Sequence, residues 1–254
     1  MIATTDEDFK QLRAAGTMLS GVLKDLVAAT KEGMTAAELD LMAEHAIKKY
    51  GAVPSFLNYQ PDGAAYAYPA TLCVSINDEI VHGIPTPQKI FRQGDVVKFD
   101  IGLSYNGYFV DMARTFTIGE GDERARKLLS ATREALDAAI AAARPGAHTG
   151  DIGAAIARVA AKHRLGIVKD LGGHAVGKAV HEKPYIDNEG AEGEGDKIEE
   201  GMVLAIEPML CEGKGDITVA KDEWTIKMRD RSRAAQFEQT VIVTKGAPEV
   251  LTAL

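Results

Sequence analysis

Four acidic residues lie inside segments that are otherwise typical of buried β-strands: Asp100, Asp111, Glu207 and Glu238. A buried carboxylate is costly unless a cation or hydrogen-bond donors compensate it, and two that approach each other also repel. One such residue alone is usually part of a hydrogen-bonded structure. Four of them suggest a shared metal centre, because carboxylate oxygens bind divalent ions and a bound ion can activate water for hydrolysis.

The spacing around Asn106-Gly107 brings two of these acids together. The segments 96–105 and 108–117 are rich in β-forming residues, and Asn-Gly between such segments predicts a two-residue hairpin turn. In that hairpin the numbers of paired residues add up to 213. Cross-strand partners share a face, as do alternate residues along a strand. Asp100 and Asp111 are therefore predicted to be diagonal neighbours on one face.

The charge of this acidic pair needs a partner. Arg114 or a lysine could supply it, and one or two divalent cations would use the oxygens better. Among the histidines, His174 lies in the glycine-rich segment 171–177, where small neighbours let a ligand approach, and His181 follows seven residues later. Four carboxylates and one histidine form an oxygen-rich set suited to a pair of Mn²⁺, Fe²⁺, Co²⁺ or Zn²⁺ ions.

Helices must precede and support these strands. Residues 6–29 and 122–143 carry apolar side chains at helical spacing, and each segment is followed by a second amphipathic helix. Thr35 with Glu38 forms a capping box at the start of the earlier of these second helices. Three further histidines are interpreted as structural or exposed: His45, His148 and His163.

The chain also repeats itself. The motif His82-Gly-Ile-Pro85 recurs later as His181-Glu-Lys-Pro184. The number of residues that separate a glycine from the acid following it in a strand is also repeated, in the same order along the chain. We interpret the chain as two copies of an ααββ unit, about 1–120 and 121–254. No linker composition separates them, so we expect one pseudo-symmetric α+β domain over residues 1–254.

Composition narrows the class of protein. The 254 residues are 46% hydrophobic and 26% charged, which is typical of a globular protein. The net charge of −8 gives little support for nucleic-acid binding; most of it comes from the acidic segment 187–200, which we interpret as a solvated loop. The two distant cysteines argue against a disulfide framework. No signal peptide or membrane-length apolar run is present, so we expect a cytoplasmic monomer.

Over nearly its whole length the chain resembles the type I methionine aminopeptidases of the pita-bread metallopeptidase family. The motifs that carry the resemblance are His82-Gly-Ile-Pro85, the hairpin acids, Gly173-His-Ala-Val-Gly177, His181-Glu-Lys-Pro184, Ile206-Glu-Pro-Met209, Trp224-Thr225 and Ala235-Gln-Phe-Glu238. The resemblance implies a pita-bread fold, in which pseudo-twofold duplicated helices pack on a curved antiparallel sheet. It also implies hydrolytic removal of the N-terminal methionine from nascent proteins or short peptides with a small second residue.

The resemblance further implies roles for particular residues. Two divalent ions (Co, Mn, Fe or Zn) would be held by Asp100, Asp111, His174, Glu207 and Glu238. Glu207 would also shuttle protons, and two histidines, His82 and His181, would flank the substrate as catalytic and substrate-binding residues. The methionine pocket would be lined by Tyr68, Cys73, Val180 and Trp224. Val180 replaces a bulky aromatic residue that is usual in the family, and Gln239 replaces a histidine.

Two alternatives stay open at this stage. The stretches 98–102 and 105–115 also resemble Xaa-Pro aminopeptidases and prolidases, which usually carry an additional N-terminal domain. A non-catalytic pita-bread binding protein is the second alternative, although all five family ligands are present. If the size rule for the second residue holds, the protein should retain its own Met1, because Ile2 is bulky.

Overall fold

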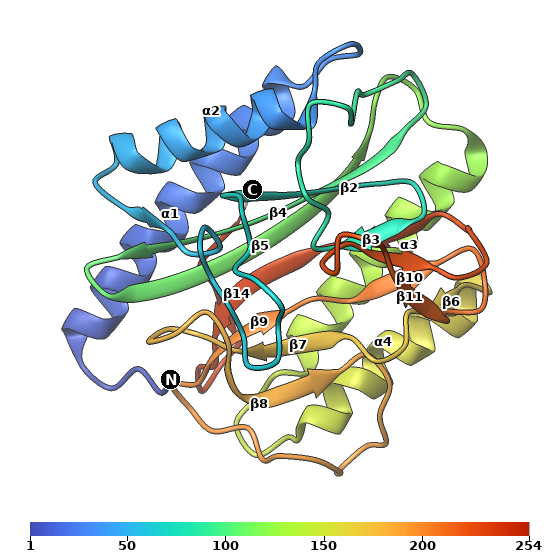
Figure 1. Cartoon of the computed structure of the whole chain (residues 1–254). Helices are drawn as coiled ribbons and strands as arrows, with labels where there is room; N and C mark the ends of the chain where they lie inside the picture. The colour runs from blue at the N-terminus through green and yellow to red at the C-terminus, as the bar shows by residue number, and fades with distance from the viewer. Residues whose placement is uncertain (254) are drawn as a thin grey trace.

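The computed structural model describes residues 1–253 and has the predicted α+β composition. Two helix pairs lie beside different parts of one large, twisted sheet (Figure 1). The four helices are α1 (Asp6–Ala29), α2 (Ala36–Lys49), α3 (Glu123–Ala142) and α4 (Thr149–His163). None of these helices, within residues 1–253, combines the length and apolar character needed to cross a membrane.

The large sheet is antiparallel and has nine strands. Its main path runs β1-β4-β5-β14-β9-β7-β8, while β2 pairs with β4 and β15 with β14. The strands are β1 (Val53–Pro54), β2 (Leu72–Ile76), β4 (Val96–Tyr105), β5 (Tyr108–Thr117), β7 (Gly172–Ala175), β8 (Glu182–Asp187), β9 (Val203–Ile206), β14 (Glu238–Ile242) and β15 (Glu249–Val250). C-terminal strands thus lie directly beside the N-terminal hairpin.

Two three-stranded sheets complete the structure. One has the order β13-β10-β6 and the other β11-β12-β3. Their strands are β3 (Glu79–Val81), β6 (Gly166–Ile167), β10 (Met209–Cys211), β11 (Ile217–Val219), β12 (Ile226–Met228) and β13 (Ala234–Gln236). Because β13 leads directly into β14, this smaller sheet fixes the approach to Glu238.

Local sequence signals set the helix ends. Thr5 caps α1 and Thr35 caps α2, and in each the carboxylate of the third helical residue accepts a hydrogen bond from the N–H of the capping threonine. This confirms the capping box predicted at Thr35 and Glu38. His148 is the N-cap residue of α4, and α4 ends at Arg164 in the left-handed conformation.

The hairpin of β4 and β5 has the predicted register. Asn106 and Gly107 have φ of 51° and 78°, as a type I′ turn requires, and Asp100 pairs with Ala113 while Gly102 pairs with Asp111. Alternate residues of β4 on the other face belong to the core beneath α1 and α2. The acids therefore lie on the face that the helices leave open.

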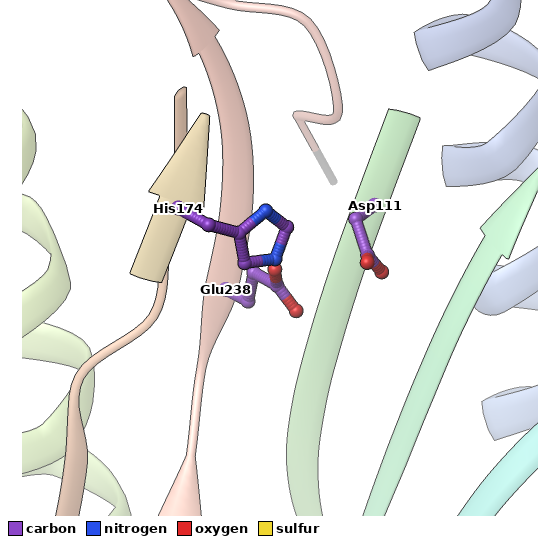
Figure 2. A group of neighbouring side chains, drawn as sticks. All are labelled: Asp111, His174 and Glu238. Atoms are coloured by element: carbon purple, nitrogen blue, oxygen red, sulfur yellow. The ribbon is translucent and has the colours of Figure 1, made fainter. Parts of the chain in front are cut away.

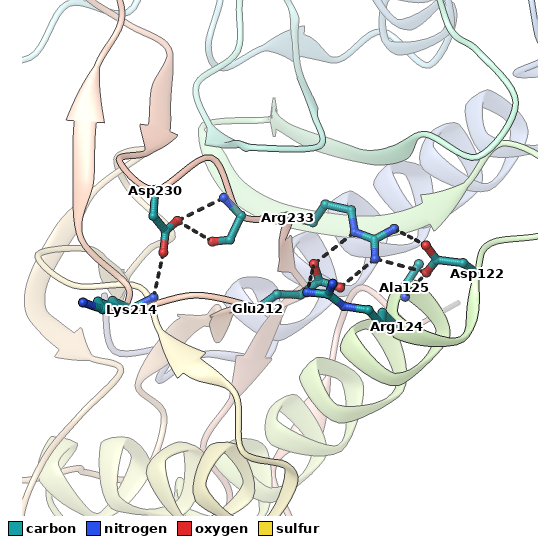
Figure 3. A network of polar contacts seen from close by, with 8 residues as sticks. Asp122, Arg124, Ala125, Glu212, Lys214, Asp230 and Arg233 are labelled. Atoms are coloured by element: carbon teal, nitrogen blue, oxygen red, sulfur yellow. Dashed lines mark hydrogen bonds and ion pairs between the residues drawn. The ribbon is translucent and has the colours of Figure 1, made fainter.

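A charged network attaches β13 to α3 (Figure 3). Arg233 donates to Glu212 at 2.7 Å and to Asp122 at 2.9 Å, and Arg124 also lies 3.2 Å from Glu212. Asp122 additionally caps α3 by accepting from the backbone N–H of Ala125. Since Glu212 is nearly buried, its pairing with Arg233 fixes the start of β13 against the helix.

The acidic loop is solvated, as expected. All seven acidic side chains between Asp187 and Glu200 are exposed, whereas the loop is anchored by the buried residues Asn188 and Ile198. Asn188 donates to the backbone carbonyl of Glu207 at 3.2 Å. The loop thus contacts the backbone of one site residue without bringing its own charges into the site.

Candidate metal centre and active site

The five proposed metal ligands come from five neighbouring strands of the large sheet. Along the order β4-β5-β14-β9-β7 they are Asp100, Asp111, Glu238, Glu207 (directly after β9) and His174. Ala113 pairs with Asp100 on one side and with Glu238 on the other, so those two acids flank a small methyl group. The sheet order therefore brings together residues that are up to 138 positions apart.

Three of these side chains form a compact donor group. Figure 2 shows His174, Glu238 and Asp111 directed into the space between their strands. Their ligand atoms all lie within 4.8 Å of one another, and all three residues are buried. Asp100 and Glu207 line the same cavity, and the Glu207 Oε1 atom lies 3.7 Å from His174 Nε2.

The electrostatics of the group call for a cation. Burial raises the pKa of Asp100 to about 7, and burial together with the neighbouring carboxylates raises the pKa of Asp111, Glu207 and Glu238 well above their usual range. One oxygen of Asp100 and one of Asp111 are buried without a hydrogen-bond partner. Orphaned acceptors among crowded carboxylates fit a divalent ion, which would accept their lone pairs and offset their charge.

The protein cations considered from the sequence do not serve this purpose. Arg114 is three residues from Asp111 on β5, which places it on the opposite face. The fully buried Lys98 donates instead to the carbonyl oxygens of Asn77 at 2.9 Å and Ala234 at 3.1 Å. Within residues 1–253, no lysine or arginine forms an ion pair with the four acids, which leaves the metal alternative.

His174 is oriented to offer one nitrogen to a metal. Its Nδ1 lies 3.0 Å from the carbonyl oxygen of Ala175, which can only accept, so Nδ1 carries the proton. The unprotonated Nε2 then faces the carboxylates. Burial lowers the pKa of His174 to about 3, which keeps the ring neutral and able to bind a metal.

Threonine and glutamine side chains hold the ligand strands in register. Thr240 both donates to the carbonyl of Asp111 and accepts from its N–H, at 2.7 and 2.9 Å. Thr115 makes the same pair of bonds with the backbone of Gln236. The Gln236 Nε2 atom donates to Glu207 at 3.0 Å and lies 3.5 Å from Asp100. These bonds limit how far the carboxylates can move apart.

An apolar pocket adjoins the carboxylates. The cavity has a volume of about 130 Å³, and the predicted pocket residues Tyr68, Cys73 and Trp224 line it. The Tyr68 hydroxyl hydrogen-bonds the carbonyl of Gly83 at 3.0 Å, so its polar end is satisfied and its ring faces apolar neighbours. Val180 is buried in the same apolar cluster as Tyr68 and Cys73, and it is not among the residues that line the cavity directly.

Both predicted catalytic histidines line the same cavity. His82 has a φ of 56°, an uncommon backbone conformation for a residue with a side chain, and its ring packs edge-on against Trp224. Burial, and next the nearby His181, lower the pKa of His82 to about 4. The His181 ring lies 4.5 Å from the ring of His174. Partial burial lowers the pKa of His181 as well, so both rings are neutral at pH 7, and both line the cavity that the donor group also lines.

Sequence reasoning missed four residues of this site, one of which is Pro61 in the cavity wall. Gln236 lies two residues before Glu238, inside the motif Ala235-Gln-Phe-Glu238, so its place near the site could have been deduced. Tyr59 and Phe56 also line the cavity, and Tyr59 contacts His181. No sequence signal identifies these two residues beyond their closeness to Tyr68.

The fold and the donor set together define a metallopeptidase. The model of metallopeptidase family M24 matches residues 10–245. A prolidase from Pyrococcus furiosus superposes with a TM-score of 0.78, covering 100% of this chain and 66% of that one, but at 22% identity this shows the shared fold alone. The predicted pita-bread fold is thereby confirmed.

Full-length relatives narrow the class. The chain is 41% identical to the methionine aminopeptidase of Aquifex aeolicus over 252 residues, which covers 98% of each protein. The crystal structure of a methionine aminopeptidase from Thermotoga maritima superposes with a TM-score of 0.93 at 36% identity, covering 100% of both chains. The chain belongs to the methionine aminopeptidase family.

Proposed function

We propose that this protein removes the N-terminal methionine from short peptides and nascent proteins whose second residue is small. The observation that carries the proposal is the five-residue donor set at the edge of an apolar cavity in a chain whose full-length relatives are methionine aminopeptidases. The cavity has a volume of about 130 Å³ and extends from the carboxylates to the apolar walls at Tyr68 and Trp224. That volume is suited to one terminal residue and its amide.

Membership in a metallopeptidase family implies divalent metal, and we propose that two ions bind here. The ions would be held by the carboxylates of Asp100, Asp111, Glu207 and Glu238 and by His174 Nε2. The buried, partnerless oxygens of Asp100 and Asp111 support this assignment. When bound, such ions lower the pKa of water and supply a hydroxide-like nucleophile near neutral pH.

The side chains of the chain supply proton transfer and charge stabilisation. Glu207 lines the cavity beside His174, with Oε1 3.7 Å from His174 Nε2, where its carboxylate would accept a proton from the attacking water and pass it on. His82 and His181 are neutral N–H donors at the cavity wall, where they would contact the scissile amide and the oxygen that gains charge during attack. The apolar walls at Tyr68 and Trp224 would receive the methionine side chain.

We also propose that residues 1–254 form one catalytic domain built from pseudo-repeats of about 1–120 and 121–254. Each proposed half begins with a pair of helices, α1 with α2 and α3 with α4, which supports this division. The metal centre requires both halves, because Asp100 and Asp111 come from one and the other three ligands from the second. A monomeric state and a cytoplasmic location stay predictions from the sequence.

The test compares substrates and metals. Metal-free protein is reloaded with Mn²⁺, Co²⁺, Fe²⁺ or Zn²⁺ and assayed on Met-Ala-Ser, Met-Val-Ser and Ala-Pro peptides. The proposal expects cleavage of Met-Ala-Ser, little cleavage of Met-Val-Ser and none of Ala-Pro. Asp111→Asn is the matched ligand variant and should be inactive with every ion. Preferential cleavage of Ala-Pro would favour the prolidase alternative, and inactivity with all ions and peptides would favour a non-catalytic binding protein.

A further inference from the structure

The backbone that carries His181 is firmly held. Glu182 accepts hydrogen bonds from the backbone N–H groups of Lys178 at 2.6 Å and Ala179 at 2.9 Å. Its other oxygen lies 2.8 Å from the amino group of Met1. The residue beside His181 therefore closes the loop between β7 and β8 onto itself, and the position of the His181 Cα atom is fixed.

The His181 ring, in contrast, is not enclosed on all sides. The residue is exposed, so rotation about its two side-chain torsions is not blocked on all sides. Within residues 1–253 its ring has one hydrogen-bond partner, the Tyr59 hydroxyl, whose oxygen lies 2.8 Å from Nδ1. The two rings also pack against each other, with centroids 5.2 Å apart and planes inclined by 56°.

Tyr59 is itself held on both sides. Its N–H donates to the carbonyl of Phe56 at 2.9 Å, and its carbonyl accepts from the N–H of Tyr68 at 2.8 Å. Phe56 and Tyr68 are walls of the apolar pocket. The same segment therefore provides the pocket wall and the hydroxyl that reaches His181, 122 residues further along the chain.

A neutral phenol can donate to Nδ1 or accept from it, and donation is the direction that leaves an N–H facing the substrate. Burial raises the pKa of Tyr59, so its phenol keeps its proton and can donate. When the phenol donates to Nδ1, the single proton of a neutral imidazole resides on Nε2. The ring then presents an N–H to a substrate carbonyl, which is the group that a histidine needs in order to stabilise an oxyanion.

We propose that Tyr59 is a positioning residue for His181. Its hydroxyl holds the ring in one orientation and fixes the tautomer that carries hydrogen on Nε2. This inference rests on the proposed peptidase function, which it deepens by naming the residue that sets the donor. Tyr59 acts through His181. Its substitution should therefore slow the chemical step, in which charge develops, and leave the binding of methionine unchanged.

The first test removes the hydroxyl alone. Tyr59→Phe, loaded with Mn²⁺, is expected to lose about tenfold in kcat on Met-Ala-Ser while KM changes by less than about twofold, since one hydrogen bond is lost and the pocket is unchanged. Tyr50→Phe is the matched control, because Tyr50 is exposed at the end of α2, and its kinetics should equal those of the wild type. An unchanged kcat in Tyr59→Phe would overturn the proposal.

A double-mutant cycle separates positioning from a general structural effect. If Tyr59 acts through His181, then Tyr59→Phe should cause no further loss of kcat in a His181→Ala background. Full additivity of the two losses would contradict the proposal. Melting temperatures of all four proteins confirm that the comparison is made between folded enzymes.

Nitrogen NMR of the Zn²⁺-loaded protein tests the tautomer without any substrate. The His181 signals, identified by their disappearance in His181→Ala, should show protonation at Nε2 in the wild type and a mixture of tautomers in Tyr59→Phe. Identical His181 signals in both proteins would overturn the proposal. Because this measurement does not depend on turnover, it distinguishes a failure of the Tyr59 assignment from a failure of the proposed function, which would show as a wild type inactive on every methionyl peptide.

Discussion

Removal of divalent cations is expected to leave a protein whose stability falls as the pH rises toward neutrality. The cause is the crowding of Asp100, Asp111, Glu207 and Glu238, whose charges lack protein cations. For Asp100 the pKa in the folded protein is raised from 3.8 to about 7. A raised carboxyl pKa contributes stability that is fully present below pH 3.8 and is lost as the pH increases through about 7.

The size of this effect follows from the Asp100 carboxyl. At about 1.4 kcal/mol per tenfold change in acid constant, a pKa of about 7 in place of 3.8 costs on the order of 4 kcal/mol once the carboxyl is ionised. The cost reaches about half that value near pH 5.5 and is nearly complete at pH 7.5. Asp100→Asn removes this charge while keeping the size of the side chain.

The assay is thermal unfolding of chelator-treated protein between pH 5.5 and 7.5. Metal-free Asp100→Asn should melt roughly 10 °C above the metal-free wild type at pH 7.5 and by a smaller margin at pH 5.5. Other titrating groups affect both proteins equally and therefore do not contribute to the difference in melting temperature. One of them is the buried Lys98, whose pKa is lowered to about 7. Asp137→Asn, at an exposed position of α3, is the control and should melt like the wild type.

The metal-loaded proteins should show the opposite order. Bound cations stabilise the wild type in proportion to their affinity, whereas Asp100→Asn lacks one ligand and should gain less from added metal. If metal-free Asp100→Asn melts at or below the wild-type temperature at pH 7.5, the four carboxylates are not mutually destabilising. The argument for a cation at this position would then fail.

Three further predictions follow from the site and its supports. Glu207→Ala and His82→Ala should each lose most turnover on Met-Ala-Ser, by about 100-fold or more, while His163→Ala should not, because His163 pairs with a surface glutamate on α3; equal losses in all three would contradict the assignment. Arg233→Met should lower the melting temperature by several degrees, since it leaves a nearly buried carboxylate without its closest partner, at a cost of about 2 kcal/mol; an unchanged melting curve would show that the network in Figure 3 does not stabilise the fold. Val180→Phe should raise the kcat/KM preference for methionine over a larger first residue by roughly tenfold, and an unchanged ratio would mean that this position does not limit the pocket.

The sequence alone determined the features that depend on short-range geometry. The capping box at Thr35 and the hairpin register at Asn106-Gly107 could be deduced because a capping bond spans three residues and a two-residue turn fixes every pair of the hairpin. With the register known, the shared face of Asp100 and Asp111 follows from the period of two. The motifs then identified the remaining ligands through resemblance, without giving their distances.

Only the tertiary structure decided which long-range partners meet. The sheet order inserts β14 and β9 between β5 and β7, which places Glu238 and Glu207 between Asp111 and His174. The contact between Tyr59 and His181 has no local signal, since it depends on how two loops from different halves pack. Turn chemistry is set by neighbouring residues, whereas these contacts are set by the burial of distant surfaces against one another, and no short segment of sequence contains that information.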